Sequence, residues 1–163
     1  NGTSFSTPIT AGIAALILSA HPELTPMQVR DALRNTASLS KNPNNILGWG
    51  IVNAYDAVLY HGMAWSNDFQ IDKKGDEIIV STYLASKDLI DPNTVKMHFS
   101  YDGDNYEEKI MKLTEPSGDP NNSGKYAVSF TPTGNMDNFK IYFSAEDYSG
   151  GKSVYPKEVS ATN

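Results

Sequence analysis

Ser4 lies near the start of the chain, in a setting that could support chemistry. Gly2 precedes it, and a run of apolar and small residues extends from about Pro8 to Ala20. A serine at the N-terminus of a buried helix lies beside unpaired backbone N–H groups and the positive end of the helix dipole, which stabilise an oxyanion. These few residues alone favour a serine that only caps a helix, and the interpretation as a nucleophile depends on a longer match described below.

A nucleophilic serine requires a general base, and the base requires a carboxylate that orients it. The chain has three histidines. His21 is expected to be an exposed residue at the end of the first helix, roughly 25 Å from Ser4 if that helix is straight. His98 falls on a predicted strand, at a surface or rim position. Neither of these two histidines is expected to serve as the base for Ser4, and His61 is weighed with the resemblance below.

No metal ligand set is expected. The absence of cysteine excludes disulfides and cysteine-ligated metals. Asp102, Asp104 and Glu107 could ligate calcium, but Asp-x-Asp alone falls far short of a calcium-loop motif. The prediction is therefore a turn at this point, no metal and no cofactor, with a structural calcium ion as the alternative.

Residues 1–62 have helical patterns. The run after Pro8 is apolar or small on every face, which predicts a helix buried on all sides. Pro8 is expected within about the first turn, where its missing N–H costs little. Gly12 is expected to allow the close approach of a neighbouring element.

Two further helices are predicted by their caps. Thr25, Pro26 and Gln28 have the types and order of an N-cap, a first helical proline and a capping box. Asn53 can cap a last helix from Ala54 to about Tyr60.

The pattern changes after about Met63, and His61–Asn67 is the expected linker. Alternating or β-rich segments predict strands over 78–84, 95–101, 126–130 and 139–145. Asp102-Gly103 is a hairpin signal, and residues 115–124 have the composition of a loop. Short strands separated by such turns predict an antiparallel β-sandwich over 63–163. About half of its aromatic side chains are expected to face the core rather than to form a binding surface.

The composition excludes some partners. The net charge of −6 argues against nucleic acid or an anionic membrane as the main partner. The apolar run from Pro8 is shorter than the roughly 20 residues that cross a bilayer, so no membrane span is expected. No signal peptide is visible, although the first residue reads as the start of a fragment rather than a natural N-terminus.

The opening segment resembles the nucleophile segment of the subtilisin-like serine proteases (subtilases, peptidase family S8). The resemblance rests on Gly-Thr-Ser-Phe-Ser-Thr-Pro at residues 2–8 with Gly12, Ala15 and Leu16 after it. It continues through Thr25–Ala37 and through Gly48–Ala57. In their order and spacing, the three segments correspond to the C-terminal part of that catalytic domain.

The resemblance implies a fold and an activity. Residues 1–62 would be the mostly helical end of an α/β domain with a three-layer, parallel-sheet architecture. Ser4 would be the nucleophile of a secreted, bacterial-type serine endopeptidase acting on polypeptide, with its own backbone N–H as an oxyanion donor. Gly2 and Thr3 would lie beside the substrate or support the turn, and Ser6 and Thr7 would be structural.

The same resemblance implies missing partners. The catalytic Asp, the catalytic His and the oxyanion Asn would precede residue 1, in the upstream part of the same domain, and the fragment alone would be inactive. His61-Gly62 faintly echoes the histidine motif of the family, but it follows the serine, whereas the family order is Asp, His, Ser.

Two other interpretations stay open. The parent could be a catalytically dead relative or an adhesion protein whose β-sandwich is the working part. Residues 139–150 resemble the last strands of fibronectin type III or immunoglobulin-like domains, which often follow the catalytic domain in secreted bacterial subtilases. An α/β-hydrolase is disfavoured, because its Gly-x-Ser-x-Gly elbow would require glycine where Ser6 stands.

Overall fold

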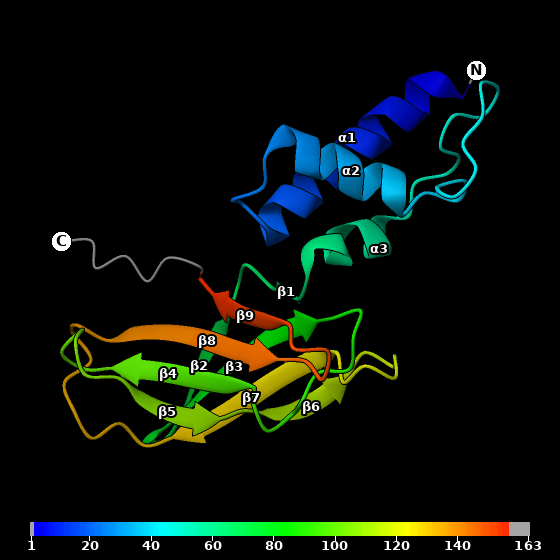
Figure 1. Cartoon of the computed structure of the whole chain (residues 1–163). Helices are drawn as coiled ribbons and strands as arrows, with labels where there is room; N and C mark the ends of the chain where they lie inside the picture. Colours follow the sequence, from blue (N-terminus) through cyan, green and yellow to red (C-terminus); the bar gives the residue numbers. More distant parts are fainter. Residues whose placement is uncertain (1, 157–163) are drawn as a thin grey trace. The chain divides into compact units, whose positions relative to one another are not determined.

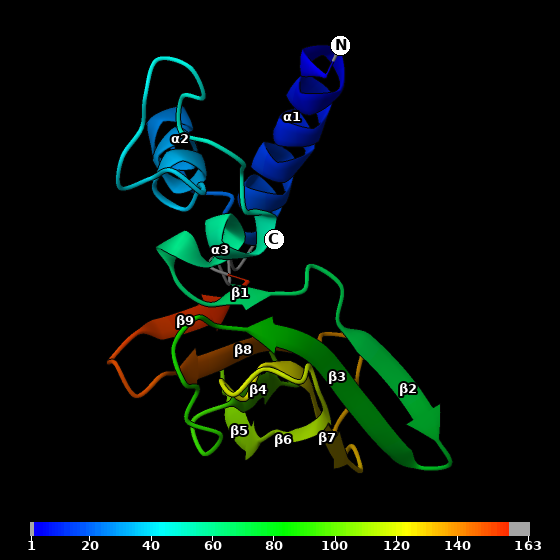
Figure 2. The same cartoon turned by 90° about the vertical axis from the view of Figure 1, so that its right-hand side faces the viewer.

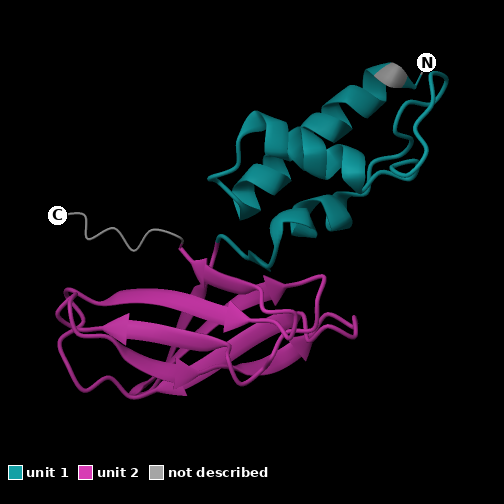
Figure 3. Ribbon diagram, in the orientation of Figure 1, with its two compact units in different colours: residues 1–67 teal, residues 68–163 magenta. Residues whose placement is uncertain are grey.

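The computed structural model describes residues 2–156. The chain forms two compact units, residues 1–67 and 68–163, hereafter unit 1 and unit 2 (Figure 3). The sequence pattern places the boundary at 62/63, at the start of the expected linker. Within the described residues, no helix is long and apolar enough to cross a bilayer.

Unit 1 is helical (Figure 1). Its elements are α1 (Thr3–Ala20), α2 (Pro26–Asn35), α3 (Ala54–Val58), the 3₁₀ helix η1 (Leu59–His61) and the short strand β1 (Ala64–Trp65). The three α-helices pack around one small cluster of buried side chains, formed by Ile13, Ile17, Val29, Ala32 and Ala57.

The caps of α2 and α3 are those predicted. Thr25 accepts a hydrogen bond from the backbone N–H of Gln28, the side chain of Gln28 accepts one from the N–H of Thr25, and Pro26 is the first helical residue. Asn53 accepts from the backbone N–H of Asp56 and begins α3. Each side chain satisfies an N–H that has no partner inside its helix.

Helix α1 differs from the prediction in two ways. It begins at Thr3, so Pro8 lies inside the helix rather than in its first turn. Only Ile13 and Ile17 are buried, whereas Phe5 and Ile9 are 73% and 62% exposed. No atom of the described chain lies within 4 Å of where a Cβ would stand on Gly12. In the described chain α2 and α3 cover only one face of α1, so the burial expected on its other faces would have to come from a part of the domain outside this chain.

Unit 2 consists of two antiparallel sheets (Figures 1 and 2). In one, β3 (Glu77–Ala85) pairs with β2 (Gln70–Lys74) and with β7 (Gly124–Phe130), which pairs in turn with β6 (Lys112–Pro116). In the other, the order is β5 (Glu107–Ile110), β4 (Lys96–Ser100), β8 (Lys140–Glu146) and β9 (Lys152–Tyr155). The predicted strands correspond to β3, β4, β7 and β8. The hairpin signal at Asp102-Gly103 lies between β4 and β5, and β9 follows the segment whose resemblance implies a final strand. Strands β2 and β6 were not predicted.

The core of unit 2 lies between the two sheets. Phe99 on β4 stacks on Phe130 of β7 with 5.0 Å between ring centroids, so side chains of the two sheets meet. Val80, Tyr126 and Phe143 are fully buried. This arrangement is that of a β-sandwich, and many of the alternating aromatic residues are core residues, as expected.

Two local features involve β7 of the first sheet and the residues next to it. The hydroxyl of Tyr126 donates a hydrogen bond to the backbone carbonyl of Asn122, at 2.7 Å. The β6–β7 ladder shifts register between Leu113 and Glu115, which pair with Tyr126 and Lys125, and Gly124 pairs with Pro116 just beyond this bulge. Gly124 has a φ of +149°, and a Cβ there would lie 2.2 Å from the Glu115 carbonyl oxygen. Only glycine fits at this position beside the bulge.

Candidate functional site

Ser4 lies in the first turn of α1, as the second residue of the helix. The N-cap is Gly2, which has no side chain and so makes no side-chain capping hydrogen bond, and no acidic residue lies in the first turn. Ser4 is exposed. Ser4 is therefore not the N-cap. The N–H groups in the first turn of α1 receive no side-chain cap and are available to bind an anion.

Pro8 interrupts the hydrogen-bond ladder of α1 behind Ser4. In an α-helix the N–H of residue 8 would donate to the carbonyl of residue 4, and proline has no N–H. The carbonyl of Ser4 therefore lacks the backbone N–H donor that it would have in an uninterrupted helix. The sequence pattern predicts Pro8 within about the first turn, where a missing N–H would cost little.

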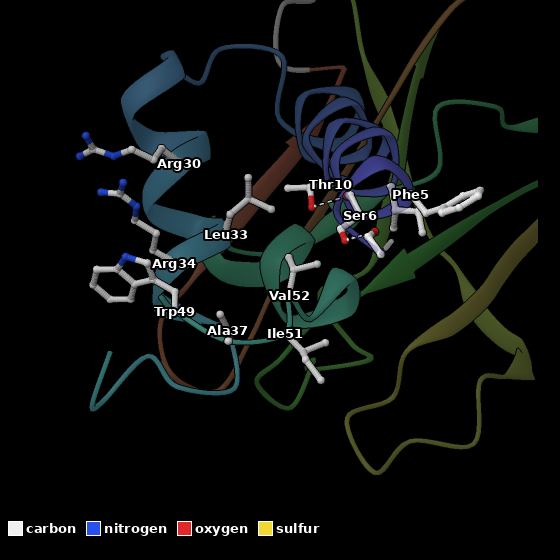
Figure 4. Close-up of a pocket in the computed structure, with 13 residues that line it drawn as sticks. Phe5, Ser6, Thr10, Arg30, Leu33, Arg34, Ala37, Trp49, Ile51 and Val52 are labelled. Atoms are coloured by element: carbon white, nitrogen blue, oxygen red, sulfur yellow. Dashed lines mark hydrogen bonds between the residues drawn. The ribbon is translucent and has the colours of Figure 1, made fainter. Parts of the chain in front are cut away.

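Two hydroxyls bond back along this face of α1 (Figure 4). Ser6 Oγ donates to the carbonyl oxygen of Gly2 at 2.8 Å, and Thr10 Oγ1 donates to the carbonyl oxygen of Ser6 at 3.0 Å. Ser6 was predicted to be a structural residue, but the specific bond was not. Its only sequence signal is the spacing of four residues between Gly2, Ser6 and Thr10.

An apolar hollow of about 600 Å³ lies beside this segment, between α1, α2 and the loop before α3 (Figure 4). Phe5, Ile9, Leu33 and Ile51 contribute apolar side chains to it. The guanidinium of Arg34 lies over the Trp49 ring, 5.5 Å from its centroid. The hollow is a surface suited to pack against apolar side chains.

None of the three histidines is hydrogen-bonded to Ser4. His21 is 1% exposed, and its Nε2 lies 3.0 Å from the carbonyl oxygen of Val58. The expectation that it is an exposed helix-end residue is therefore wrong, because α3 packs over the end of α1. His61 Nε2 lies 3.2 Å from the carbonyl oxygen of Gln28.

The first part of the chain matches a known family. Residues 1–50 match the subtilase family. The same region is 51% identical over 59 residues to the serine protease AprX of Bacillus subtilis (strain 168), a match that covers 36% of this chain and 13% of AprX. It is 51% identical over 57 residues to subtilisin E of the same strain, covering 35% of this chain and 15% of that protein. It is 46% identical over 54 residues to subtilisin Savinase of Lederbergia lenta, covering 33% and 20%.

The extent of the match defines a subtilase segment, residues 1–50. The aligned stretch spans between 13% and 20% of the length of these three relatives. The segment contains Ser4, the N-terminal turn of α1 and most of the apolar hollow. Most of the length of each relative therefore has no counterpart in this chain.

His98 lies in unit 2, half-buried on β4. Its Nε2 is 2.8 Å from Ser144 Oγ, and its ring stacks on Tyr142 with 4.3 Å between centroids. Burial lowers the pKa of His98 despite the opposing charge of Glu108 on the paired strand, whose carboxylate accepts a hydrogen bond from Lys96. This serine–histidine pair is the one arrangement within residues 2–156 that resembles part of a catalytic triad.

Asp102 forms a self-contained turn. Its carboxylate accepts hydrogen bonds from the backbone N–H groups of Asp104 and Asn105, from the Asn105 side chain and from Ser100 Oγ. These bonds hold the pKa of Asp102 well below its usual range. The predicted turn is confirmed. In residues 2–156 no three His, Asp or Glu side chains gather to hold a metal ion.

Proposed function

We propose that Ser4 is the nucleophile of a secreted, bacterial-type serine endopeptidase that cleaves extended polypeptide through an acyl-enzyme. The observation that carries the proposal is the position of Ser4. It is exposed on the first turn of a helix without a side-chain cap, inside the subtilase segment. Uncapped N–H groups at a helix N-terminus favour the negative charge that develops during attack on a carbonyl.

The reaction assigns separate roles to the groups of Ser4. Its Oγ attacks the carbonyl carbon of the scissile peptide, forming a C–O bond while the hydroxyl proton passes to a general base. The carbonyl oxygen becomes an oxyanion and accepts a hydrogen bond from the backbone N–H of Ser4. Collapse of the tetrahedral intermediate breaks the C–N bond, the amine leaves with a proton from the base, and water then hydrolyses the acyl-enzyme.

The residues around Ser4 support access by a substrate. Gly2 has nothing within 4 Å of where its Cβ would stand, so a substrate backbone can approach closely. Thr3 would support the same turn, although its side chain lies outside the described residues. The base, its carboxylate and an oxyanion Asn would come from an earlier part of the same catalytic domain, which would also cover the exposed apolar face of α1.

Because the base and its carboxylate would come from an earlier part of the domain, we expect the 163-residue chain alone to be inactive. Without base and carboxylate, a serine retains only weak rate enhancement from binding and the oxyanion hole. The earlier part of the domain would supply a three-layer, parallel-sheet architecture of the subtilisin type. The chain would then be the C-terminal portion of that domain followed by unit 2.

Unit 2 would be a domain of the immunoglobulin or fibronectin type III class. The bond from Tyr126 to the carbonyl of Asn122 supports this proposal, because it has the form of a tyrosine corner, in which a tyrosine hydroxyl bonds to the backbone a few residues upstream. The two antiparallel sheets around an aromatic core agree with the same class.

The test uses the complete protein that contains this chain. A fluorophosphonate probe should label Ser4, as mapped by mass spectrometry of the labelled peptide, and Ser4→Ala should abolish the labelling. Ser144→Ala serves as the matched control, because Ser144 Oγ lies 2.8 Å from a histidine nitrogen, and it should leave the labelling unchanged. If a folded and processed protein remains unlabelled at Ser4, the proposal fails, and unit 2 becomes the working part, as in a catalytically dead relative.

A further inference from the structure

The turn between β4 and β5 contains the one Asp-Gly dipeptide of the chain, Asp102-Gly103. In such a dipeptide the backbone nitrogen of the glycine can attack the carboxyl carbon of the aspartate, because glycine has no side chain to obstruct the approach. The product is a five-membered succinimide ring, and its hydrolysis gives isoaspartate. Asp102 is exposed, so burial does not keep water or a base away from this reaction.

The reaction has a defined balance of atoms. The Gly103 nitrogen forms a bond to Cγ of Asp102, its proton passes to solvent, and the hydroxyl of the protonated carboxyl group leaves as water. Water then opens the ring at either carbonyl. Attack at the original backbone carbonyl leaves the chain running through Cγ, which is isoaspartate, and attack at Cγ restores aspartate. Ring closure therefore requires a free Gly103 nitrogen and a protonated Asp102 carboxyl group.

One hydroxyl engages both reacting groups. Ser100 Oγ accepts a hydrogen bond from the backbone N–H of Gly103 at 2.9 Å and donates one to Oδ1 of Asp102 at 2.8 Å. Ser100 is 1% exposed, and it lies on β4 in register with Lys140 of β8. The hydroxyl is therefore held by the sheet, and it directs the N–H of Gly103 to itself.

The rest of the Asp102 carboxylate is occupied as well. Oδ1 also accepts hydrogen bonds from the backbone N–H groups of Asn105 and Asp104, and Oδ2 accepts one from the Asn105 side chain. These bonds stabilise the ionised form and hold the pKa of Asp102 well below its usual range. Since ring closure requires the protonated form, they oppose the reaction from the side of the electrophile.

We propose that Ser100 protects Asp102-Gly103 from conversion to isoaspartate. Both bonds of the Ser100 hydroxyl must break before the Gly103 nitrogen reaches Cγ, so they raise the barrier to ring closure. Without the hydroxyl, this dipeptide becomes a site of spontaneous modification in an exposed turn. The proposal concerns unit 2 and is independent of the proposed function of Ser4.

Isoaspartate at this position would alter the β4–β5 hairpin. It adds one carbon atom to the backbone and removes the side-chain carboxylate that binds the N–H groups of Asp104 and Asn105. The pairing of Phe99 with Glu107 lies next to the turn and would be the first part of the ladder to weaken. Protection of the dipeptide therefore preserves an edge of the sheet.

The experiment follows isoaspartate at residue 102 over time in the complete protein, near neutral pH and at physiological temperature. Every sample carries Ser4→Ala, so that self-cleavage does not remove the product. Electron-transfer fragmentation of the peptide that contains residue 102 distinguishes isoaspartate from aspartate, and the loss of one water marks the succinimide. An unstructured synthetic peptide with the sequence of residues 98–107 gives the rate without the protective bonds.

We expect the folded protein to form isoaspartate more slowly than the peptide. Ser100→Ala should form it at least about tenfold faster than the protein that retains Ser100, because the hydroxyl makes two hydrogen bonds. Tyr126→Phe is the matched control. It removes a different hydroxyl bond of unit 2 and leaves those of Ser100 in place, so its rate should stay unchanged.

Asp102→Asn separates the two parts of the protection. Asparagine cyclises with loss of ammonia and needs no protonation of a carboxylate, so its rate reports on the Gly103 nitrogen alone. In the folded protein this variant should deamidate more slowly than a peptide with the same substitution. The measurement remains decisive if Ser100→Ala does not fold.

Three results would overturn the proposal. Equal rates of isoaspartate formation in the folded protein and the peptide would show that the turn gives no protection. An unchanged rate for Ser100→Ala, or an equal acceleration by Tyr126→Phe, would assign the protection to the general stability of unit 2. Equal deamidation of Asp102→Asn in protein and peptide would show that the Gly103 nitrogen is not held.

Discussion

Replacing Tyr126 with phenylalanine should destabilise unit 2 by about 1–2 kcal/mol. Tyr126 is fully buried, and its hydroxyl donates to the carbonyl of Asn122 at 2.7 Å. Tyr126→Phe keeps the ring and its packing but leaves that carbonyl without this donor. A lost hydrogen bond costs about 0.5–1.5 kcal/mol net, and more when the remaining partner is buried and unsatisfied.

The assay should report on unit 2 alone, because the chain has two compact units. Urea unfolding followed through the amide NMR signals of β3 and β7 meets this need. For a domain of this size, each kcal/mol lowers Tm by about 4–8 °C, so the expected shift in Tm is about 4–16 °C.

Tyr83 supplies the control. It lies on β3 in the same sheet, it is 49% exposed, and its hydroxyl is 3.4 Å from Glu115 Oε2. Tyr83→Phe should change the free energy of unfolding by less than about 0.5 kcal/mol, as is usual for surface substitutions. An equal cost for both variants, or no cost for Tyr126→Phe, would refute the reasoning.

Tyr126 also makes the free energy of unfolding of unit 2 depend on pH. Burial, and next the charge of Asp119, raise the pKa of Tyr126 to about 12, above the value near 10 of an unfolded tyrosine. The folded state therefore binds this proton more tightly. Its contribution to stability is complete below about pH 10 and is lost as the pH rises toward 12. Between about pH 10 and 12, Tyr126→Phe should lose less stability than the unsubstituted protein. An identical slope of the free energy of unfolding against pH would contradict the raised pKa of Tyr126.

Three further predictions concern packing, capping and exposure. Ile17→Ala should destabilise unit 1 by about 2–4 kcal/mol, since Ile17 is fully buried in its small core; an unchanged Tm of the helical circular dichroism signal would contradict this. Thr25→Ala removes the capping box and should cost about 1 kcal/mol in urea unfolding of the same signal, and no shift in midpoint would refute the cap's contribution. The double variant Phe5→Ser, Ile9→Ser should reduce self-association in light scattering, because both side chains are exposed on α1. Ile71→Ser, at a half-exposed position of unit 2, should not.

Local signals in the sequence predicted the elements that local bonds determine. The Thr25 capping box and the Asn53 cap were predicted because the side chain and the N–H that it binds are three residues apart. The turn at Asp102 was predicted for the same reason, since its bonds reach only to neighbouring residues. Propensity and spacing are sufficient for such features.

Features that depend on distant residues were not predicted. The burial of His21 results from contact with Val58, 37 positions along the chain. Strand β2 was missed because all five of its residues are exposed, so it has no alternation of buried and exposed positions to detect. Ser4 was recognised from a family pattern, whereas the bond from Ser6 to Gly2 required the start of α1 to be located at Thr3.

Gly124, which pairs with Pro116 at the start of β7, limits how unit 2 can diverge. A Cβ at this position would collide with the Glu115 carbonyl, with Leu113 Cδ1 and with Pro116 Cα, and two of these three atoms belong to the backbone. No change of rotamer removes a clash with backbone atoms, so a substitution here requires the backbone of β6 or β7 to shift. Because a shift of one residue in register turns every side chain of a strand to the opposite face, this glycine helps to keep the side chains of β7 on their present faces. Descendants of this sequence can lose Gly124 only by rebuilding the pairing of β6 with β7.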